Sequence, residues 1–389
     1  MIQRRSIITG PTFTAMALVG VFHAFWGTTL PAIRDFLQIN VEAAALLSSA
    51  NLVGQAAACL PGGLLCDLLR REKVLMLGCF MLGSGVLLLC TIPLYHVAVF
   101  LAFWSGLGCG LILISSTAVF VMMYPDRKGP VINTSQMIYG GMLLVSPLIM
   151  GSLLTSSVGW QRGFEVLGLL LGGTGVFFLL THLPGAVLGR ARTFGADVGR
   201  LFGRGFFIVL LITGALGCGA QIAVMYYVVT LLTDGKGFSV LYAGSVLSVF
   251  YICLFAGRVI CSWLTRWIPM MKLIPVFLLL ELAGLTITWQ GEGWSSAFGV
   301  AICGLGCSGL YPCLLALTGT LFSDLAGTSM GALTSAGYVG GMAIVWGSGY
   351  VSQAFHLNWG FVPIIAGALG AVSVFHYGSR AFLREALKA

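Results

Sequence analysis

Three ionisable side chains stand inside long apolar stretches of the sequence, where charge is costly and therefore informative. They are Arg258, Glu281 and His23. A guanidinium at such a position can hold a carboxylate, a carboxyl group can neutralise that charge or exchange a proton, and an imidazole can take part in either step. The three residues predict a site that binds and releases a small solute, and not an enzyme active site.

Arg258 and Glu281 are expected at matching depths in neighbouring spans. Arg258 lies eight residues before Arg266 and Glu281 nine residues after Lys272, which places them about 12 and about 14 Å from the same side of the membrane. One interpretation is a structural ion pair, because an unpaired buried charge costs several kcal/mol. The other is that Arg258 binds an anionic substrate while Glu281 neutralises or releases it. The two are compatible if substrate or a proton breaks the pair.

Uncharged polar and aromatic side chains in the apolar stretches are expected to line the same cavity. Buried amides need partners, and a water-filled cavity or a ligand supplies them. For the tyrosines, helix packing or a position at the membrane interface is the alternative, and for His23 it is an ordinary structural hydrogen bond. The predicted lining, besides the three ionisable groups, is Trp26, Gln55, Gln136, Tyr139, Tyr226, Tyr311 and Tyr338.

The composition shows what kind of element must position these residues. Only 8% of the 389 residues are charged, against roughly 25% in soluble globular proteins. The hydrophobic fraction is 58% and the mean hydropathy is +0.99. Because a water-soluble surface cannot be built from so few charges, the chain is expected to be an integral membrane protein that contacts lipid.

Twelve apolar runs are long enough to cross a bilayer as helices, which takes about 20 residues each. None shows the strict alternation of a transmembrane β-strand, so the predicted fold is all-α. The expected spans are roughly 10–33, 42–66, 73–94, 97–123, 130–155, 163–183, 205–232, 238–264, 271–290, 295–322, 326–353 and 359–379.

Lysine and arginine are distributed unequally between the two sides of these spans. Sixteen fall on the side of both termini, three on the other side, and Arg258 on neither. The positive-inside rule therefore predicts cytoplasmic termini and a multi-pass protein of the cytoplasmic (inner) membrane. The net charge of +8 does not indicate nucleic-acid binding, because the cations lie between apolar segments rather than on one exposed face.

The eleven cysteines all lie inside apolar runs, where thiols act as small apolar residues. We expect no disulfides. Cys303 and Cys307 would share a helix face, but helix packing explains them better than a metal site, because no histidine or acidic residue stands beside them. Neither a metal nor a cofactor is predicted.

The chain contains a weak internal repeat. Residues 62–67 resemble 257–262, residues 106–109 resemble 304–307, and residues 140–142 resemble 340–342. The offsets are nearly equal and pair each helix with the sixth one after it, as expected of parallel repeats. The predicted domains are a six-helix bundle over 1–183, a cytoplasmic loop over 184–204 and a second bundle over 205–389.

With twelve spans, a six-plus-six repeat and a basic central loop, the whole chain resembles the major facilitator superfamily. The family's loop motif between helices two and three is present in degraded form as Gly63, Asp67, Arg70, Arg71 and Lys73, although Leu68 and Arg70 depart from it. In the family this loop latches the cytoplasmic ends of the bundles. The resemblance therefore implies gating roles for Asp67, Arg70 and Arg71, with positive-inside charge as the plainer explanation of the arginines.

The resemblance implies a secondary or facilitative transporter, a monomer, whose partners are a small solute and membrane lipid; coupling to a proton stays open. The pair Gly257-Arg258 is similar to the arginine position of monocarboxylate and oxalate/formate-type porters, which favours an organic anion as substrate. Residues 309–312 resemble fucose-permease-like porters, so a neutral sugar is the alternative. A drug or metabolite exporter is third.

Overall fold

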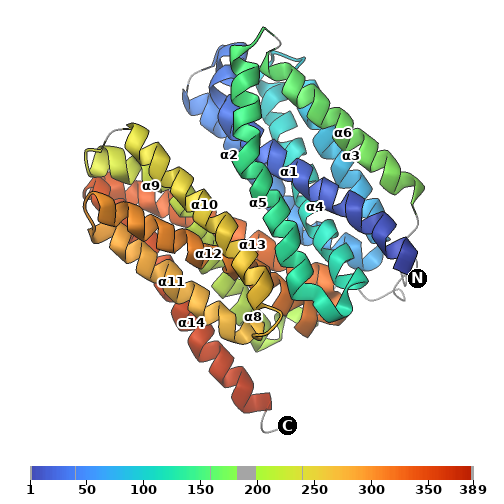
Figure 1. The fold of residues 1–389 in the computed structure, drawn as a ribbon, viewed down its shortest axis with the longest axis vertical. Helices are drawn as coiled ribbons and strands as arrows, with labels where there is room; N and C mark the ends of the chain where they lie inside the picture. Colours follow the sequence, from blue (N-terminus) through green and yellow to red (C-terminus); the bar gives the residue numbers. More distant parts are fainter. Residues whose placement is uncertain (1, 40, 158, 182–198, 239, 387–389) are drawn as a thin grey trace. The chain divides into compact units, whose positions relative to one another are not determined.

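The computed structural model describes residues 2–39, 41–157, 159–181, 199–238 and 240–386. Helices dominate the described chain, which contains no strand (Figure 1). The helices of the first half are α1 (Ile2–Leu37), α2 (Val41–Leu68), α3 (Arg71–Leu89), α4 (Tyr95–Met123), η1 (Pro125–Arg127), α5 (Lys128–Thr155) and α6 (Trp160–Leu180). Those of the second half are α8 (Gly205–Thr213), η2 (Gly214–Cys218), α9 (Gly219–Thr230), η3 (Leu231–Gly235), α10 (Val240–Leu264), α11 (Met270–Gln290), α12 (Trp294–Leu321), η4 (Ser323–Leu325), α13 (Ala326–Ala354), η5 (Leu357–Phe361) and α14 (Val362–Ala386).

Each of the twelve predicted spans coincides with a helix or, over 205–232, with the continuous path from α8 through η2 to α9. Among the described residues, ten helical segments are long and apolar enough to cross a membrane. That set does not include α2 and α13, whose lengths of 28 and 29 residues also suffice for a crossing. The fold class is thus an all-α membrane protein, as predicted.

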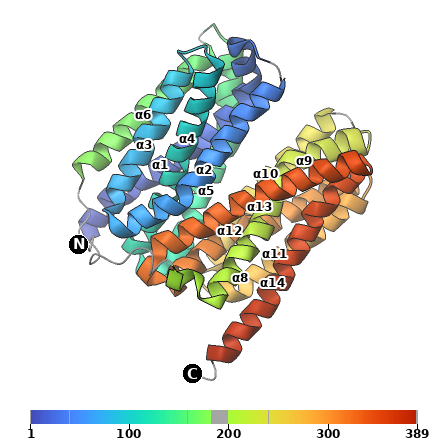
Figure 2. The same cartoon turned by 180° about the vertical axis from the view of Figure 1, so that it is seen from behind.

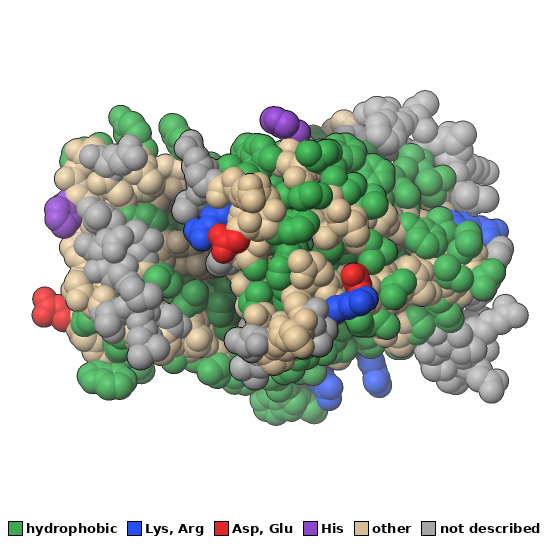
Figure 3. Space-filling model, turned by 90° about the horizontal axis from the view of Figure 1, so that it is seen from above, with side chains coloured by type: hydrophobic (Ala, Val, Ile, Leu, Met, Phe, Trp, Pro, Cys, Tyr) green, Lys and Arg blue, Asp and Glu red, His purple; other side chains and the backbone are tan. Residues whose placement is uncertain are grey.

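The described outer surface is apolar in the way that lipid contact requires. Large hydrophobic side chains are openly exposed along the helices, among them Leu169 at 69% and Leu180 at 75%. The face drawn in Figure 3 shows many hydrophobic side chains among backbone and uncharged polar groups, and few charged side chains. Such a surface would aggregate in water, and it is the normal exterior of a protein solvated by acyl chains.

The chain divides into two compact units, each described here by itself. The first comprises residues 1–128, 135–192 and 324–335; the second comprises 129–134, 193–323 and 336–389. Two short stretches belong to the unit formed mainly by the other half of the sequence. The beginning of α5 belongs to the second unit, and the beginning of α13 belongs to the first. The predicted domain boundaries stay a prediction.

Helix α4 is the centre of the first unit and packs closely against α2 and α3. Its glycines permit this. A Cβ atom on Gly106 would overlap the carbonyl oxygen of Asn51 in α2, and one on Gly108 would lie 2.8 Å from the carbonyl oxygen of Gly78 in α3. Small residues at such contacts let helix backbones approach within a membrane, where close packing replaces the hydrophobic effect as the main attraction.

Helix α12 has the same role in the second unit. A Cβ atom on Gly304 would lie 2.7 Å from the carbonyl oxygen of Phe250 in α10, and one on Gly306 would overlap the backbone nitrogen of Glu281 in α11. The sequence match between residues 106–109 and 304–307 therefore corresponds to equivalent contacts: the first glycine of each pair meets one neighbouring helix and the second meets the other.

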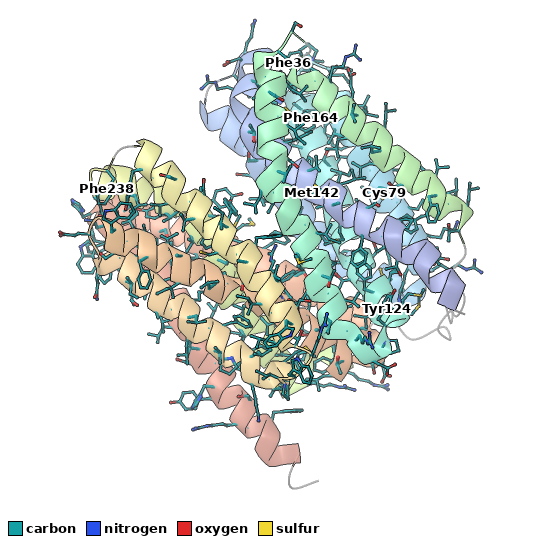
Figure 4. The ribbon with its side chains drawn as sticks, viewed as in Figure 1. Phe36, Cys79, Tyr124, Met142, Phe164 and Phe238 are labelled. Atoms are coloured by element: carbon teal, nitrogen blue, oxygen red, sulfur yellow. The ribbon has the colours of Figure 1, made fainter. Side chains whose placement is uncertain are left out.

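The third sequence match also has a structural counterpart. In the first unit Gly20 of α1 packs against α5, where its Cβ position lies 2.9 Å from the Cβ of Met142, the residue labelled in Figure 4. In the second unit Gly219 of α9 packs in the same way against Gly340 and Gly341 of α13. The two units are thus built on one plan.

The helical path between α8 and η3 contains two π-helical segments, η2 and η3. Just beyond η3, Lys236 donates hydrogen bonds to the carbonyl oxygens of Thr288 and Gly291 at the end of α11, and to Ser296. Burial lowers the pKa of Lys236, an effect that nearby Glu292 partly opposes. This lysine complements the negative end of the α11 dipole and ties the two loops at that end of the second unit together.

Candidate functional site

A chain of polar side chains runs through the first unit and joins three of the predicted lining residues. His23 of α1 shares a 2.9 Å hydrogen bond between its Nδ1 and the hydroxyl of Tyr139 in α5, and its Nε2 lies 3.6 Å from the thiol of Cys109 in α4. The side chain of Gln55 in α2 also hydrogen-bonds His23. Four helices therefore meet at one imidazole.

The hydrogen-bonded network of side chains continues into α2 and α4. Gln55 donates a 2.8 Å hydrogen bond to Asn51, and Asn51 donates a 3.0 Å bond to the carbonyl oxygen of Ala102. Sequence reasoning missed Asn51 and Cys109; the spacing of four residues between Asn51 and Gln55, which places both on one helix face, was the available signal for Asn51. Donors and acceptors that carry no fixed charge suit recognition of hydroxyl groups.

Two further predicted lining residues lie near this network on the same helices. Trp26 is one turn after His23, 7% exposed, and its indole donates a 3.1 Å hydrogen bond to Ser48 in α2. Gln136, 4% exposed, lies one turn before Tyr139 on α5. His23, Tyr139 and Gln55 therefore come together in the structure, with Trp26 and Gln136 one turn away along α1 and α5; the role of all five in binding stays a prediction.

We expect Gln55→Leu to lower the free energy of unfolding by about 2 kcal/mol. The substitution removes the hydrogen bond that Gln55 donates to the buried Oδ1 of Asn51, and it removes a hydrogen-bond partner of His23. Reversible unfolding in mixed detergent micelles would measure the change. Gln290→Leu is the matched control, since Gln290 is exposed at the end of α11. An equal change in both variants would contradict a structural role for the network.

Arg258 is buried in α10, with 4% of its surface exposed. Its neighbour Gly257 packs against Ser308 of α12. One turn further on the same face as Arg258, Ser262 lies 3.5 Å from the carbonyl oxygen of Pro130 in the first turn of α5. The arginine therefore lies on the face of α10 that turns toward the first residues of α5.

Glu281 is completely buried in α11, but it does not pair with Arg258. Neither carboxylate oxygen has a described partner within ordinary hydrogen-bond distance, and the polar group that acts on the carboxyl is the Cys307 thiol of α12. The interpretation as an ion pair is therefore wrong for this structure. The physical reason is that α12 packs against both α10 and α11, so equal depth along two helices did not bring the side chains together.

The three predicted tyrosines of the second unit differ in exposure. Tyr226 of α9 is 52% exposed, whereas Tyr311 of α12 and Tyr338 of α13 are half-buried. The adjacent Tyr227, 9% exposed, contacts the hydroxyl of Ser352 through its own hydroxyl. The substrate role of Tyr226, Tyr311 and Tyr338 stays a prediction.

Asp67, the predicted gating residue, caps the beginning of α13. Its carboxylate accepts hydrogen bonds from the backbone nitrogens of Gly327 at 3.0 Å and Thr328 at 2.7 Å, and from the Thr328 hydroxyl at 2.6 Å. An anion at a helix N-terminus is favoured by the helix dipole and by the free N–H groups. Gly63 makes the approach possible, because a Cβ atom there would overlap the carbonyl oxygen of Gly327.

The two predicted gating arginines stand beside this contact at the start of α3. Arg70 is the N-cap residue and Arg71 the first helical residue, and both are half-buried. Within the described part of the chain neither guanidinium makes a hydrogen bond or an ion pair. In the second unit the residue equivalent to Asp67 is Ser262, which likewise contacts the first turn of a helix. The gating role of the three residues stays a prediction.

Comparison with known proteins places this arrangement in context. Residues 12–345 match the family model described as Major Facilitator Superfamily. The fold is similar to that of the fucose:proton symporter FucP from E. coli, with a TM-score of 0.83 and 16% sequence identity over 96% of this chain and 99% of that chain. It is also similar to the proton:xylose symporter XylE, with a TM-score of 0.76 and 14% identity over 95% of this chain and 94% of that chain.

Proposed function

Because the chain belongs to the major facilitator superfamily, and is therefore a multi-pass membrane transporter, we propose that it carries a small organic anion by alternating access, with Arg258 as the charge partner. The observation that carries this proposal is the burial of a guanidinium within a membrane-spanning helix. We place the transporter in the cytoplasmic membrane with both termini inside the cell, following the distribution of lysine and arginine.

The chemistry of Arg258 suits a carboxylate. A guanidinium stays charged under all relevant conditions, and its planar fork of donors matches a carboxylate in two parallel hydrogen bonds. Keeping such a group inside a membrane protein is costly, and intramembrane charges usually serve substrate pathways.

The internal repeat shows that Arg258 is not part of the shared scaffold. Its counterpart in the first unit is Gly63, which packs against the first turn of α13. The second unit has a long cation at the place where the first unit has no side chain at all. A residue added to one copy of a duplicated framework is better explained by what it binds than by the packing of the framework.

We expect Arg258→Ala to lower kcat/KM for uptake of a radiolabelled carboxylate into proteoliposomes about thirtyfold, which corresponds to the roughly 2 kcal/mol of a charged hydrogen bond. Arg258→Lys should keep part of the activity, because the charge remains but the fork is lost. Arg266→Ala is the control, because Arg266 is exposed in the turn that follows α10. Unchanged uptake by folded Arg258→Ala protein would refute the anion proposal.

A neutral sugar is the second candidate, and the uncharged polar network around His23 favours it. Hydroxyl groups of a sugar would find both donors and acceptors among Tyr139, Gln55 and Asn51. FucP and XylE, whose folds are similar, are proton symporters for fucose and xylose. Competition decides between the candidates: hexoses in excess should leave carboxylate uptake unchanged if the anion proposal holds, and should suppress labelled sugar uptake if the alternative holds.

A further inference from the structure

The outer face of the first unit has a groove of about 340 Å³ between α3 and α6, with α4 at one end. These helices pack side by side, as Figures 1 and 2 show from opposite directions. The lining is almost wholly apolar. Among the lining residues are Leu77, Phe80, Ser84 and Leu87 of α3, Trp104 of α4, and Gly168 and Gly172 of α6.

Glycines of α6 make the floor of the groove. Gly168 lies against Gly83 of α3, where a Cβ atom would come within 3.0 Å of the Gly83 carbonyl oxygen, so the backbones touch at this point. One turn further, Gly172 has no atom within 4 Å of the position where its Cβ would stand. The groove is therefore open beside Gly172 because a side chain is missing there, not because the helices separate.

The polar side chains described in the groove are satisfied by its own lining. The indole nitrogen of Trp104 donates a 3.2 Å hydrogen bond to the hydroxyl of Ser84, which in turn donates one of 3.2 Å to the carbonyl oxygen of Met81. The wall thus presents an aromatic ring and methylene groups to whatever occupies the groove. Around it, Leu77, Val166 and Leu169 are 42%, 55% and 69% exposed, as expected of a surface in contact with lipid. An empty apolar groove at this depth would lose its dispersion contacts, and acyl chains are the molecules available to fill it.

A cation stands on the same helix face as the groove. Lys73, Leu77, Phe80, Ser84 and Leu87 follow one another at intervals of four, three, four and three residues, which places them on a single face of α3. The ammonium of Lys73 donates a 2.7 Å hydrogen bond to the carbonyl oxygen of Leu179 at the end of α6. A lysine has three donors, so two remain for a phosphate.

The depth of the groove fits a lipid whose headgroup lies at Lys73. From Lys73 the groove extends from about 6 to about 21 Å along the axis of α3, while half of the hydrocarbon core is about 15 Å thick. An acyl chain that starts at the level of Lys73 would therefore run along the groove and end near Trp104. We propose that this groove binds one acyl chain of an anionic phospholipid from the bilayer, with Lys73 holding its phosphate.

Brominated lipids test this directly, because bromine quenches tryptophan fluorescence only on contact. The purified full-length protein is placed in nanodiscs that contain phosphatidylglycerol or phosphatidylcholine brominated near the methyl end of the chain. The contribution of Trp104 is the difference in quenching between the natural chain and Trp104→Phe. We expect brominated phosphatidylglycerol to reach half-maximal quenching of Trp104 at an about fivefold lower fraction than phosphatidylcholine.

Three variants identify the site. Gly172→Leu should at least halve the quenching of Trp104, because the leucine side chain would fill the groove. Gly173→Leu is the control and should leave the quenching unchanged, because Gly173 also has open space at its Cβ position but does not line the groove. Lys73→Gln should remove the preference for phosphatidylglycerol. Equal quenching by both lipids, or equal effects of the two glycine variants, would reduce the groove to ordinary lipid contact and overturn the proposal. Absence of quenching by either lipid, together with a dimer in the nanodisc, would overturn it in favour of a second copy of the chain.

Discussion

Replacing Gly106 with valine should leave no folded protein to purify. The Cβ atom alone would overlap the carbonyl oxygen of Asn51, and two methyl groups would add to the overlap where α2 and α4 touch. Backbone cannot move aside as a flexible side chain can, so α2 would have to separate from α4 along its length. Overpacking of ordinary cores already costs 1–3 kcal/mol, and here the cost should exceed the 5–15 kcal/mol that stabilises a typical domain.

Fluorescence-detected size-exclusion chromatography of the tagged protein measures this outcome as the yield of monodisperse material. Gly304→Val should behave in the same way, because Gly304 meets α10 in the second unit as Gly106 meets α2 in the first. Gly173→Val is the control: this exposed helix glycine has no atom within 4 Å of its Cβ position. A natural yield and melting temperature for Gly106→Val would show that the packing of α2 on α4 is not as described.

Asp67→Ala should lower the transport rate by about 150- to 900-fold. The substitution removes three hydrogen bonds to the first turn of α13, two of them from backbone nitrogens at a helix N-terminus. Hydrogen bonds to a charged group contribute 1.5–3 kcal/mol each, and since they share one carboxylate we expect a joint loss of about 3–4 kcal/mol. In a transporter that alternates between states, such a loss shifts the population away from the state that contains the contact.

Two companion variants make the Asp67 result interpretable. Asp67→Asn keeps one acceptor oxygen and should retain intermediate transport, whereas Asp126→Ala removes an exposed carboxylate from η1 and should leave transport unchanged. Counterflow in proteoliposomes gives the rate, and a melting curve of each purified variant separates loss of cycling from loss of folding. If folded Asp67→Ala protein transported at the natural rate, the gating role inferred from the loop motif would be wrong.

The positions and order of the long helices in the described chain could be predicted from the sequence because a lipid environment leaves little choice. Every backbone polar group must be satisfied inside its own segment, so each long apolar run becomes a helix. The rise of 1.5 Å per residue predicts that Arg258 lies well inside its span, and the structure shows the side chain buried in the protein; its depth in the membrane stays a prediction. The repeat was predictable as well, because the glycines that form the helix contacts recur at a constant offset.

Tertiary structure alone decided which side chains meet. Rotation about a helix axis and the choice of neighbour depend on how pairs of helices pack, and a local pattern contains no information about the second helix. Glu281 therefore lies against Cys307 and not Arg258, His23 is joined to Tyr139 and Gln55 from two other helices, and Asp67 caps a turn 260 residues away. The apolar runs of the sequence determine which segments span the membrane and how deep each residue is expected to lie. The glycine contacts between helices determine which side chains of different helices meet.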